Sequence, residues 1–242
     1  MPRSACSPTD VTDVLHLVAM GGYEIPGPSG PPSVLERYLF ELSDAERPRV
    51  CFLATASGDA PDFLARFYEI CETIPSEPCH LALFHDRDVD DLDAFLAPCD
   101  VVYVGGGNTA SMLAVWRAHG LDGALARRAS AGDVVIGGAS AGAMCWFTSG
   151  LTMSFGPLGP LPDGLGWLPG SFGPHAQLPG RLDVHAQLVA SGALAPGWAV
   201  DDGAALHYVD GRLVRAVAAS ADARVHTVDA GGAHEHACER LG

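Results

Sequence analysis

The sequence contains no lysine, so arginine carries all of the basic charge other than that of histidine. This absence excludes a Schiff-base lysine, a Ser-Lys dyad and the phosphate-binding lysine of a GxxxxGK[ST] loop. Basic residues are also scarce overall, because 14 arginines stand against 29 acidic residues and give a formal net charge of −15. Nucleic-acid binding draws on basic surface, so this balance argues against a nucleic-acid partner.

The sequence also lacks a plausible membrane segment. The stretch from Val134 to Pro162 has no Asp, Glu or Arg, but glycines and prolines interrupt it repeatedly, which favours a buried strand followed by loops. In the first 20 residues, Asp10 and Asp13 interrupt the sequence and the apolar run from Val14 to Met20 is short, so no secretory signal is predicted. We therefore expect no membrane partner.

The seven cysteines do not form a disulfide pattern. They are odd in number, widely spaced and mostly embedded in apolar runs such as residues 50–53. This usage is typical of reduced core residues, and it predicts a cytoplasmic protein.

The hydrophobic pattern predicts an α/β fold with a mostly parallel central sheet flanked by helices. Short apolar runs alternate with amphipathic stretches, and the length of 242 residues favours a single domain over 1–242, with frayed termini at 1–10 and 231–242. The predicted strands are residues 14–19, 50–54, 80–84, 101–104 and 134–136, and the predicted helices lie near 33–43, 60–74, 89–97 and 108–130.

The second half of the chain has a weaker pattern. Residues 150–180 are rich in Gly, Pro and Leu, and we interpret them as a long ordered loop over the sheet. A helix near 182–190 and strands at 204–209, 213–217 and 224–228 are predicted to follow.

A GxSxG motif is the sharpest chemical signal. Residues 138–142 read Gly-Ala-Ser-Ala-Gly and lie between a predicted strand and a helix-compatible stretch, which is the context of a nucleophile elbow. Small neighbours relieve the crowding at such a tight turn. Ser140 is therefore the candidate nucleophile, and the N–H of Ala141 is a candidate donor to an oxyanion.

A second glycine-rich turn, Gly-Gly-Gly-Asn-Thr at 105–109, follows another predicted strand. Bare glycines allow the backbone to approach a ligand closely. We expect Gly106 and Gly107 to supply a second oxyanion donor. Asn108 is a candidate both for capping the next helix and for binding substrate.

The chain resembles the peptidase E and cyanophycinase group of serine peptidases, which has a class I glutamine amidotransferase-like fold of the flavodoxin-like, three-layer type. The resemblance rests on residues 104–109 and 138–146, on the blocks at 163–166 and 168–175, and on residues 201–207 (Asp-Asp-Gly-Ala-Ala-Leu-His). It implies that Ser140 is the nucleophile and that His175 is its general base. The other histidines, including His185 and His207, are interpreted as surface or packing residues, and the resemblance implies no metal or organic cofactor.

The sequence departs from this family at the third catalytic residue. Met153 stands where relatives carry the acid that orients the histidine. Three explanations are open: Asp163 or Glu24 supplies the carboxylate, Ser140 and His175 act as a dyad with help from a water or from a hydroxyl such as that of Ser154, or the protein no longer hydrolyses its ligand.

The resemblance further implies a small peptide substrate, specifically an aspartyl dipeptide (Asp-X). Arg181 is the candidate cation for the substrate carboxylate, because no other arginine lies between Arg128 and Arg181. The alternatives are a catalytically impaired binding or regulatory protein, and an amidase or esterase acting on another acyl substrate. A homodimer is compatible with the sequence, which does not determine the oligomeric state.

Overall fold

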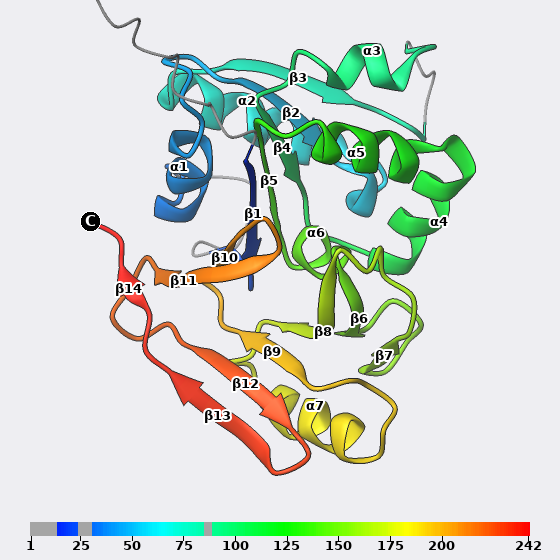
Figure 1. Ribbon diagram of the computed structural model, residues 1–242, viewed down its shortest axis with the longest axis vertical. Coiled ribbons are helices and arrows are strands. Elements are labelled where there is room, and N and C mark those ends of the chain that lie inside the picture. Colours follow the sequence, from blue (N-terminus) through cyan, green and yellow to red (C-terminus); the bar gives the residue numbers. More distant parts are fainter. Residues whose placement is uncertain (1–13, 24–30, 85–88) are drawn as a thin grey trace, which may run out of the picture.

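The computed structural model describes residues 14–23, 31–84 and 89–242. Two sheets dominate it, with helices packed on both faces of the larger one and helices against the smaller one as well (Figure 1). The predicted three-layer α/β architecture is confirmed for the larger sheet, and the smaller sheet was not predicted.

Eight described strands form the larger sheet, in the order β14-β11-β10-β1-β5-β4-β2-β3. The five strands from β1 to β3 in that order run parallel, whereas β10 and β11 add antiparallel neighbours beside β1. The strands are β1 (Leu15–Met20), β2 (Arg49–Leu53), β3 (Glu77–Leu81), β4 (Val101–Val104), β5 (Val134–Ala139), β10 (Ala204–Val209), β11 (Arg212–Ala218) and β14 (Glu239–Arg240).

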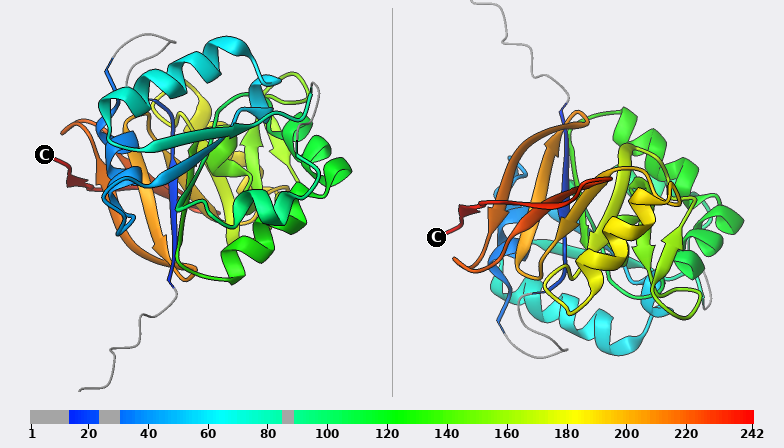
Figure 2. Two further views of the ribbon diagram at one scale, coloured as in Figure 1. Left: turned by 90° about the horizontal axis from the view of Figure 1, so that it is seen from above. Right: turned by 90° about the horizontal axis from the view of Figure 1, so that it is seen from below.

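Helices cover both faces of this sheet because its central strands are apolar on both sides. In β2, Val50 and Phe52 point to one face, and Cys51 and Leu53 point to the other. The first face packs against α1 (Val34–Glu41) and α2 (Pro61–Thr73), and the second against α3 (Leu92–Leu96), α4 (Thr109–His119) and α5 (Leu121–Ser130). Figure 2 shows α2 in cyan on one side and α4 and α5 in green on the other.

Local signals fix where these helices begin and end. Ser33 and Glu36 form a capping box at the start of α1, and Pro61 occupies the first turn of α2. The predicted helix over 108–130 is divided in two, because Gly120 adopts a left-handed conformation (φ 73°) that ends α4.

A six-stranded sheet replaces the loop expected over 150–180. Its strand order is β13-β12-β9-β8-β6-β7. The bounds are β6 (Phe147–Thr152), β7 (Gly159–Leu161), β8 (Leu168–Pro174), β9 (Gly197–Val200), β12 (Val225–Asp229) and β13 (Gly232–His236). Helix α7 (Arg181–Ala190) packs against this sheet, with Val189 buried beside Ala199 and Val228 (Figure 2, right).

The carboxyl terminus also differs from expectation. Residues 231–242 were predicted to be frayed, but β13 pairs with β12 and β14 pairs with β11. Backbone pairing compensates there for side chains that are mostly exposed and polar, which is why the hydrophobic pattern did not predict these strands. Residues 1–10 lie outside the described residues.

None of the described helices has the length and apolar character needed to cross a bilayer.

The short helix α6 (Ala141–Met144) lies close to the end of β4, and this packing requires a glycine. A Cβ at Gly142 would overlap the carbonyl oxygen of Val104. We expect Gly142→Ala to lower the free energy of unfolding by about 1–3 kcal/mol, the usual cost of overpacking. Denaturant unfolding measures the change.

Gly123→Ala on α5 is the matched control. A Cβ there meets only the end of the flexible Arg127 side chain, at 3.3 Å. Because alanine has a higher helix propensity than glycine, the free energy of unfolding of this variant is expected to rise by up to about 1 kcal/mol. Equal effects of the two substitutions would contradict the packing explanation.

Candidate active site

Ser140 lies at a strained turn between β5 and α6. Its backbone has φ 54° and ψ −108°, a conformation that non-glycine residues rarely adopt. The neighbouring glycines permit the turn, since a Cβ at Gly138 or Gly142 would overlap the Val104 carbonyl oxygen. This is the strand-turn-helix geometry that the GxSxG motif predicts.

His175 reaches Ser140 from the second sheet. It directly follows β8 and also has a positive φ, 55°. Its Nε2 lies 2.8 Å from the Ser140 Oγ. The smaller sheet therefore carries the imidazole to the edge of the larger sheet where β5 ends.

A carboxylate occupies the other side of the imidazole. The Asp202 Oδ1 lies 2.5 Å from the Nδ1 of His175. Asp202 follows β9, which pairs in parallel with β8, so both residues leave the same end of the second sheet. The three side chains form one hydrogen-bonded chain in the order Asp202, His175, Ser140.

Gln177 holds the second oxygen of this carboxylate. Its Nε2 donates to the Asp202 Oδ2 at 2.6 Å, and its Oε1 accepts from the Asp202 backbone N–H at 2.9 Å. Gly22 makes room for the pair, because a Cβ there would overlap the Asp202 Oδ1 and come within 2.7 Å of the imidazole ring. The segment that follows β8 thus holds both oxygens of the carboxylate, and Gly22 leaves the space that the carboxylate occupies.

These contacts determine the ionisation of Asp202. Burial raises the pKa of its carboxyl group, but hydrogen bonds from His175 and Gln177 and the charges of His175 and Arg181 together outweigh burial and lower the pKa below 3.8. Asp202 therefore stays ionised throughout the neutral range and can accept the Nδ1–H of His175.

The carboxylate beside His175 is neither of the two acids that the sequence analysis considered. Asp163 forms a bidentate ion pair with Arg117, with a shortest contact of 2.9 Å, and it is largely exposed. Glu24 lies outside the described residues. Asp202 was missed, although it belongs to the block at 201–207 that supported the family resemblance.

The hydroxyl considered for a dyad lies elsewhere as well. The Ser154 Oγ is 2.8 Å from the Thr152 Oγ1 and accepts from the Ala110 N–H. Met153 has an exposed fraction of 64%, so the position where relatives carry the acid points into solvent here.

The glycine-rich turn approaches Ser140 as expected. A Cβ at Gly106 would lie 3.6 Å from the Cβ of Ser140, and the Gly106 N–H donates to the hydroxyl of Tyr23 at 3.3 Å. Gly107 has φ 142°, and a Cβ there would overlap the Ala56 carbonyl oxygen, so no larger residue fits. Ala141 supplies the first N–H of α6, one of the amides that a helix leaves without an internal partner.

Asn108 has a structural role in this turn. Its Oδ1 accepts from the Ser111 N–H and caps α4, and its Nδ2 donates to the Ser154 carbonyl. These contacts satisfy the capping expectation. Binding of substrate by Asn108 remains a prediction.

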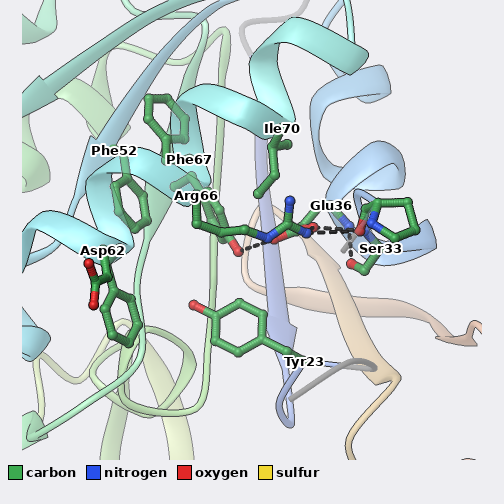
Figure 3. Close-up of a pocket in the computed structure, with 11 residues that line it drawn as sticks. Tyr23, Ser33, Glu36, Phe52, Asp62, Arg66, Phe67 and Ile70 are labelled. Carbon is green, nitrogen blue, oxygen red and sulfur yellow. Dashed lines mark hydrogen bonds and ion pairs between the residues drawn. The ribbon is translucent and has the colours of Figure 1, made fainter. Parts of the chain in front are cut away.

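A cavity of about 300 Å³ opens next to Tyr23. Aromatic side chains, including Phe52, Phe63 and Phe67, form much of its wall (Figure 3). Arg66 extends across it from α2 toward Glu36 of α1, with 3.7 Å between the charged atoms. Tyr23 both lines the cavity and contacts Gly106, so the cavity adjoins the oxyanion turn.

Arg181 lies at the start of α7, close to His175 in the chain. Its Nε donates to the carbonyl oxygen of Pro174, the residue before His175, at 2.9 Å. Burial lowers the pKa of Arg181, and the charge of Asp202 opposes that effect. Among the described residues, no hydrogen-bond partner is found for its terminal nitrogens.

An α/β fold that carries a hydrogen-bonded serine, histidine and carboxylate is typical of hydrolytic enzymes. Comparisons with known proteins identify the family within this class. Residues 17–216 match the profile of Peptidase family S51. The chain is 43% identical over 216 residues to the uncharacterized peptidase YgaJ of Bacillus subtilis, covering 88% of this chain and 91% of that protein.

Two solved structures have the same fold. A crystal structure of a peptidase from an acI-B1 Actinobacterium matches with a TM-score of 0.63 at 16% identity, covering 93% of this chain and 94% of that one. A putative peptidase E protein from Listeria monocytogenes matches with a TM-score of 0.62 at 16% identity, covering 86% and 100%. The chain belongs to peptidase family S51, and the resemblance stated from the sequence is confirmed.

The contacts of Asp202 predict its response to pH. Because the folded-state pKa is lowered, ionised Asp202 contributes stability that is complete above its unfolded pKa and is lost as pH falls through the folded value. Gln177→Met removes a hydrogen bond that lowers this pKa, so the pKa of Asp202 is expected to rise. NMR titration of the carboxyl group measures the pKa of Asp202. An unchanged pKa in Gln177→Met would contradict the claim that the hydrogen bond from Gln177 lowers it.

Proposed function

We propose that this S51 peptidase is a serine peptidase of the cytoplasm that hydrolyses small peptides, with aspartyl dipeptides as substrates. The observation that carries the proposal is the hydrogen-bonded chain from Asp202 through His175 to Ser140. A serine hydroxyl is a weak nucleophile until a neighbouring base accepts its proton, and the imidazole is within reach to do so.

In this proposal Ser140 attacks the peptide carbonyl carbon while the Nε2 of His175 takes the hydroxyl proton. The oxyanion accepts hydrogen bonds from the N–H groups of Ala141 and Gly106, the latter now bonded to Tyr23. His175 then donates its proton to the leaving amine, and an acyl-enzyme ester remains on Ser140. Water, deprotonated by the same imidazole, hydrolyses the ester and restores the serine.

Asp202 acts on this cycle through His175. By accepting the Nδ1–H, the carboxylate keeps the Nε2 free to act as a base and stabilises the imidazolium that forms in the transition state. The missing acid at Met153 was the main argument for a non-hydrolytic protein. A carboxylate beside His175 removes that argument and favours turnover.

We propose that the carboxylate of an aspartyl substrate is bound by Arg181. Its terminal nitrogens are uncommitted among the described residues, whereas Arg66 already pairs with Glu36. The guanidinium is held beside His175 by its contact with Pro174. The cavity beside Tyr23, with its aromatic wall, suits the side chain of the residue X.

The proposal predicts the effect of changing each member of the chain. Ser140→Ala is expected to abolish both hydrolysis of an Asp-X dipeptide panel and labelling by a serine-directed covalent probe. Asp202→Asn is expected to keep the fold and to lower kcat by up to about 10⁴-fold, the scale seen where an orienting acid is lost from intact geometry. Steady-state kinetics and mass spectrometry measure these changes.

Asp163→Asn is the matched control and is expected to retain full activity. Absence of both cleavage and labelling in the wild-type protein would overturn the proposal in favour of a binding protein. Ester turnover that depends on Ser140, without dipeptide turnover, would instead favour the amidase or esterase alternative.

The specificity proposal has its own test. Arg181→Gln is expected to raise KM for Asp-X about tenfold or more while leaving Ala-X kinetics nearly unchanged, because it removes a charge-assisted hydrogen bond to one substrate only. Arg66→Gln is the comparison variant. If Arg66→Gln, and not Arg181→Gln, selectively loses Asp-X binding, then Arg66 rather than Arg181 binds the substrate carboxylate.

A further inference from the structure

Three cysteines converge at a place that the peptidase chemistry does not use. The sulfur atoms of Cys51, Cys79 and Cys99 all lie within 4.8 Å of one another. Cys51 is in β2, Cys79 is its register partner in the edge strand β3, and Cys99 lies in the turn between α3 and β4. Figure 1 shows β2, β3 and α3 together at one end of the molecule.

The three thiols face one another because of the strand register and the turn. Parallel register partners point to the same face of a sheet, which brings Cys51 and Cys79 together. The turn at Cys99 is fixed by two backbone contacts: its N–H donates to the Leu96 carbonyl, and its own carbonyl accepts from Arg128 at 2.9 Å. The sulfur atoms are therefore assembled by the folded backbone.

The spacing suits a shared metal ion better than a disulfide. A zinc ion holds thiolate sulfur at about 2.3 Å in tetrahedral geometry, which places bound sulfur atoms about 3.8 Å apart. Sulfur atoms that lie within 4.8 Å of one another need only a small approach to reach that separation. Cys51 and Cys99 are buried and Cys79 is half-buried, so the cluster is closed on one side and open to a water ligand on the other.

A cation already lies at this cluster. The guanidinium of Arg49 interacts with the thiols of Cys79 and Cys99, and its Nε is a buried nitrogen without a hydrogen-bond partner among the described residues. Three thiolates and a divalent ion leave one negative charge, which Arg49 neutralises. Soft thiolate ligands select zinc over oxygen-preferring ions such as Mg²⁺ or Ca²⁺.

We propose that Cys51, Cys79 and Cys99 bind one zinc ion in a structural site separate from Ser140. The ion ties the edge strand β3 to β2 and to the turn before β4. The assignment does not depend on the proposed peptidase activity.

The test uses the reduced full-length protein, stripped of metal with a chelator and titrated with Co²⁺. We expect near-ultraviolet thiolate-to-cobalt absorption that saturates at one ion per chain and is abolished when Zn²⁺ displaces the cobalt. This absorption requires sulfur ligands, so it distinguishes the cluster from histidines such as His234 and His236. Zinc is also expected to raise the thermal unfolding midpoint.

Cys79→Ser and Cys99→Ser are each expected to weaken metal binding at least tenfold and to remove the zinc-dependent rise in the midpoint. Cys71→Ser is the matched control, because Cys71 is also buried but lies on the opposite face of the sheet, and it is expected to bind as the wild type does. Lack of thiolate-to-cobalt absorption in the wild type, or undiminished absorption in both ligand variants, would overturn the proposal. Formation of a disulfide among these cysteines without metal binding would also overturn it.

Discussion

The imidazole of His175 bridges the two sheets of this protein, and the geometry of the site depends on that bridge. On one side it meets Ser140 at the end of β5, and on the other it meets Asp202 beyond β9. The contact with Ser140 joins the two sheets, whereas the contact with Asp202 joins the ends of two paired strands of the smaller sheet. The smaller sheet therefore positions two of the three residues and the larger sheet positions the third.

Small residues make this meeting of sheets possible. Gly22 leaves space for the Asp202 carboxylate and the imidazole, and Gly138 and Gly142 allow the turn at Ser140 to press against Val104. Both Ser140 and His175 adopt positive φ values, which cost energy in non-glycine residues. The surrounding buried strands hold them in place, so rigidity around the site compensates for strain within it.

The sequence predicted those parts of the fold and site that are governed by local pattern. Apolar runs identified the strands of the parallel sheet, and GxSxG identified the turn at Ser140 from a few adjacent residues. Asp202 was not identified, because it lies 27 residues beyond His175 and reaches it only through the pairing of β8 with β9. The sequence Leu-Pro-Gly-Ser-Phe-Gly-Pro of β8 has few strand-favouring residues, so that pairing was hidden. The residue pattern that could have identified the carboxylate beside His175 is the block at 201–207, rather than the position of Met153.

The central claim is that Asp202 orients His175, and the Nδ1 proton of that imidazole tests it most directly. A proton held between imidazole and a carboxylate gives a far-downfield signal in the proton NMR spectrum. The account predicts such a signal in the wild-type protein and in Asp163→Asn, and its loss in Asp202→Asn. Persistence of the signal in Asp202→Asn, or its loss in Asp163→Asn, would contradict the account.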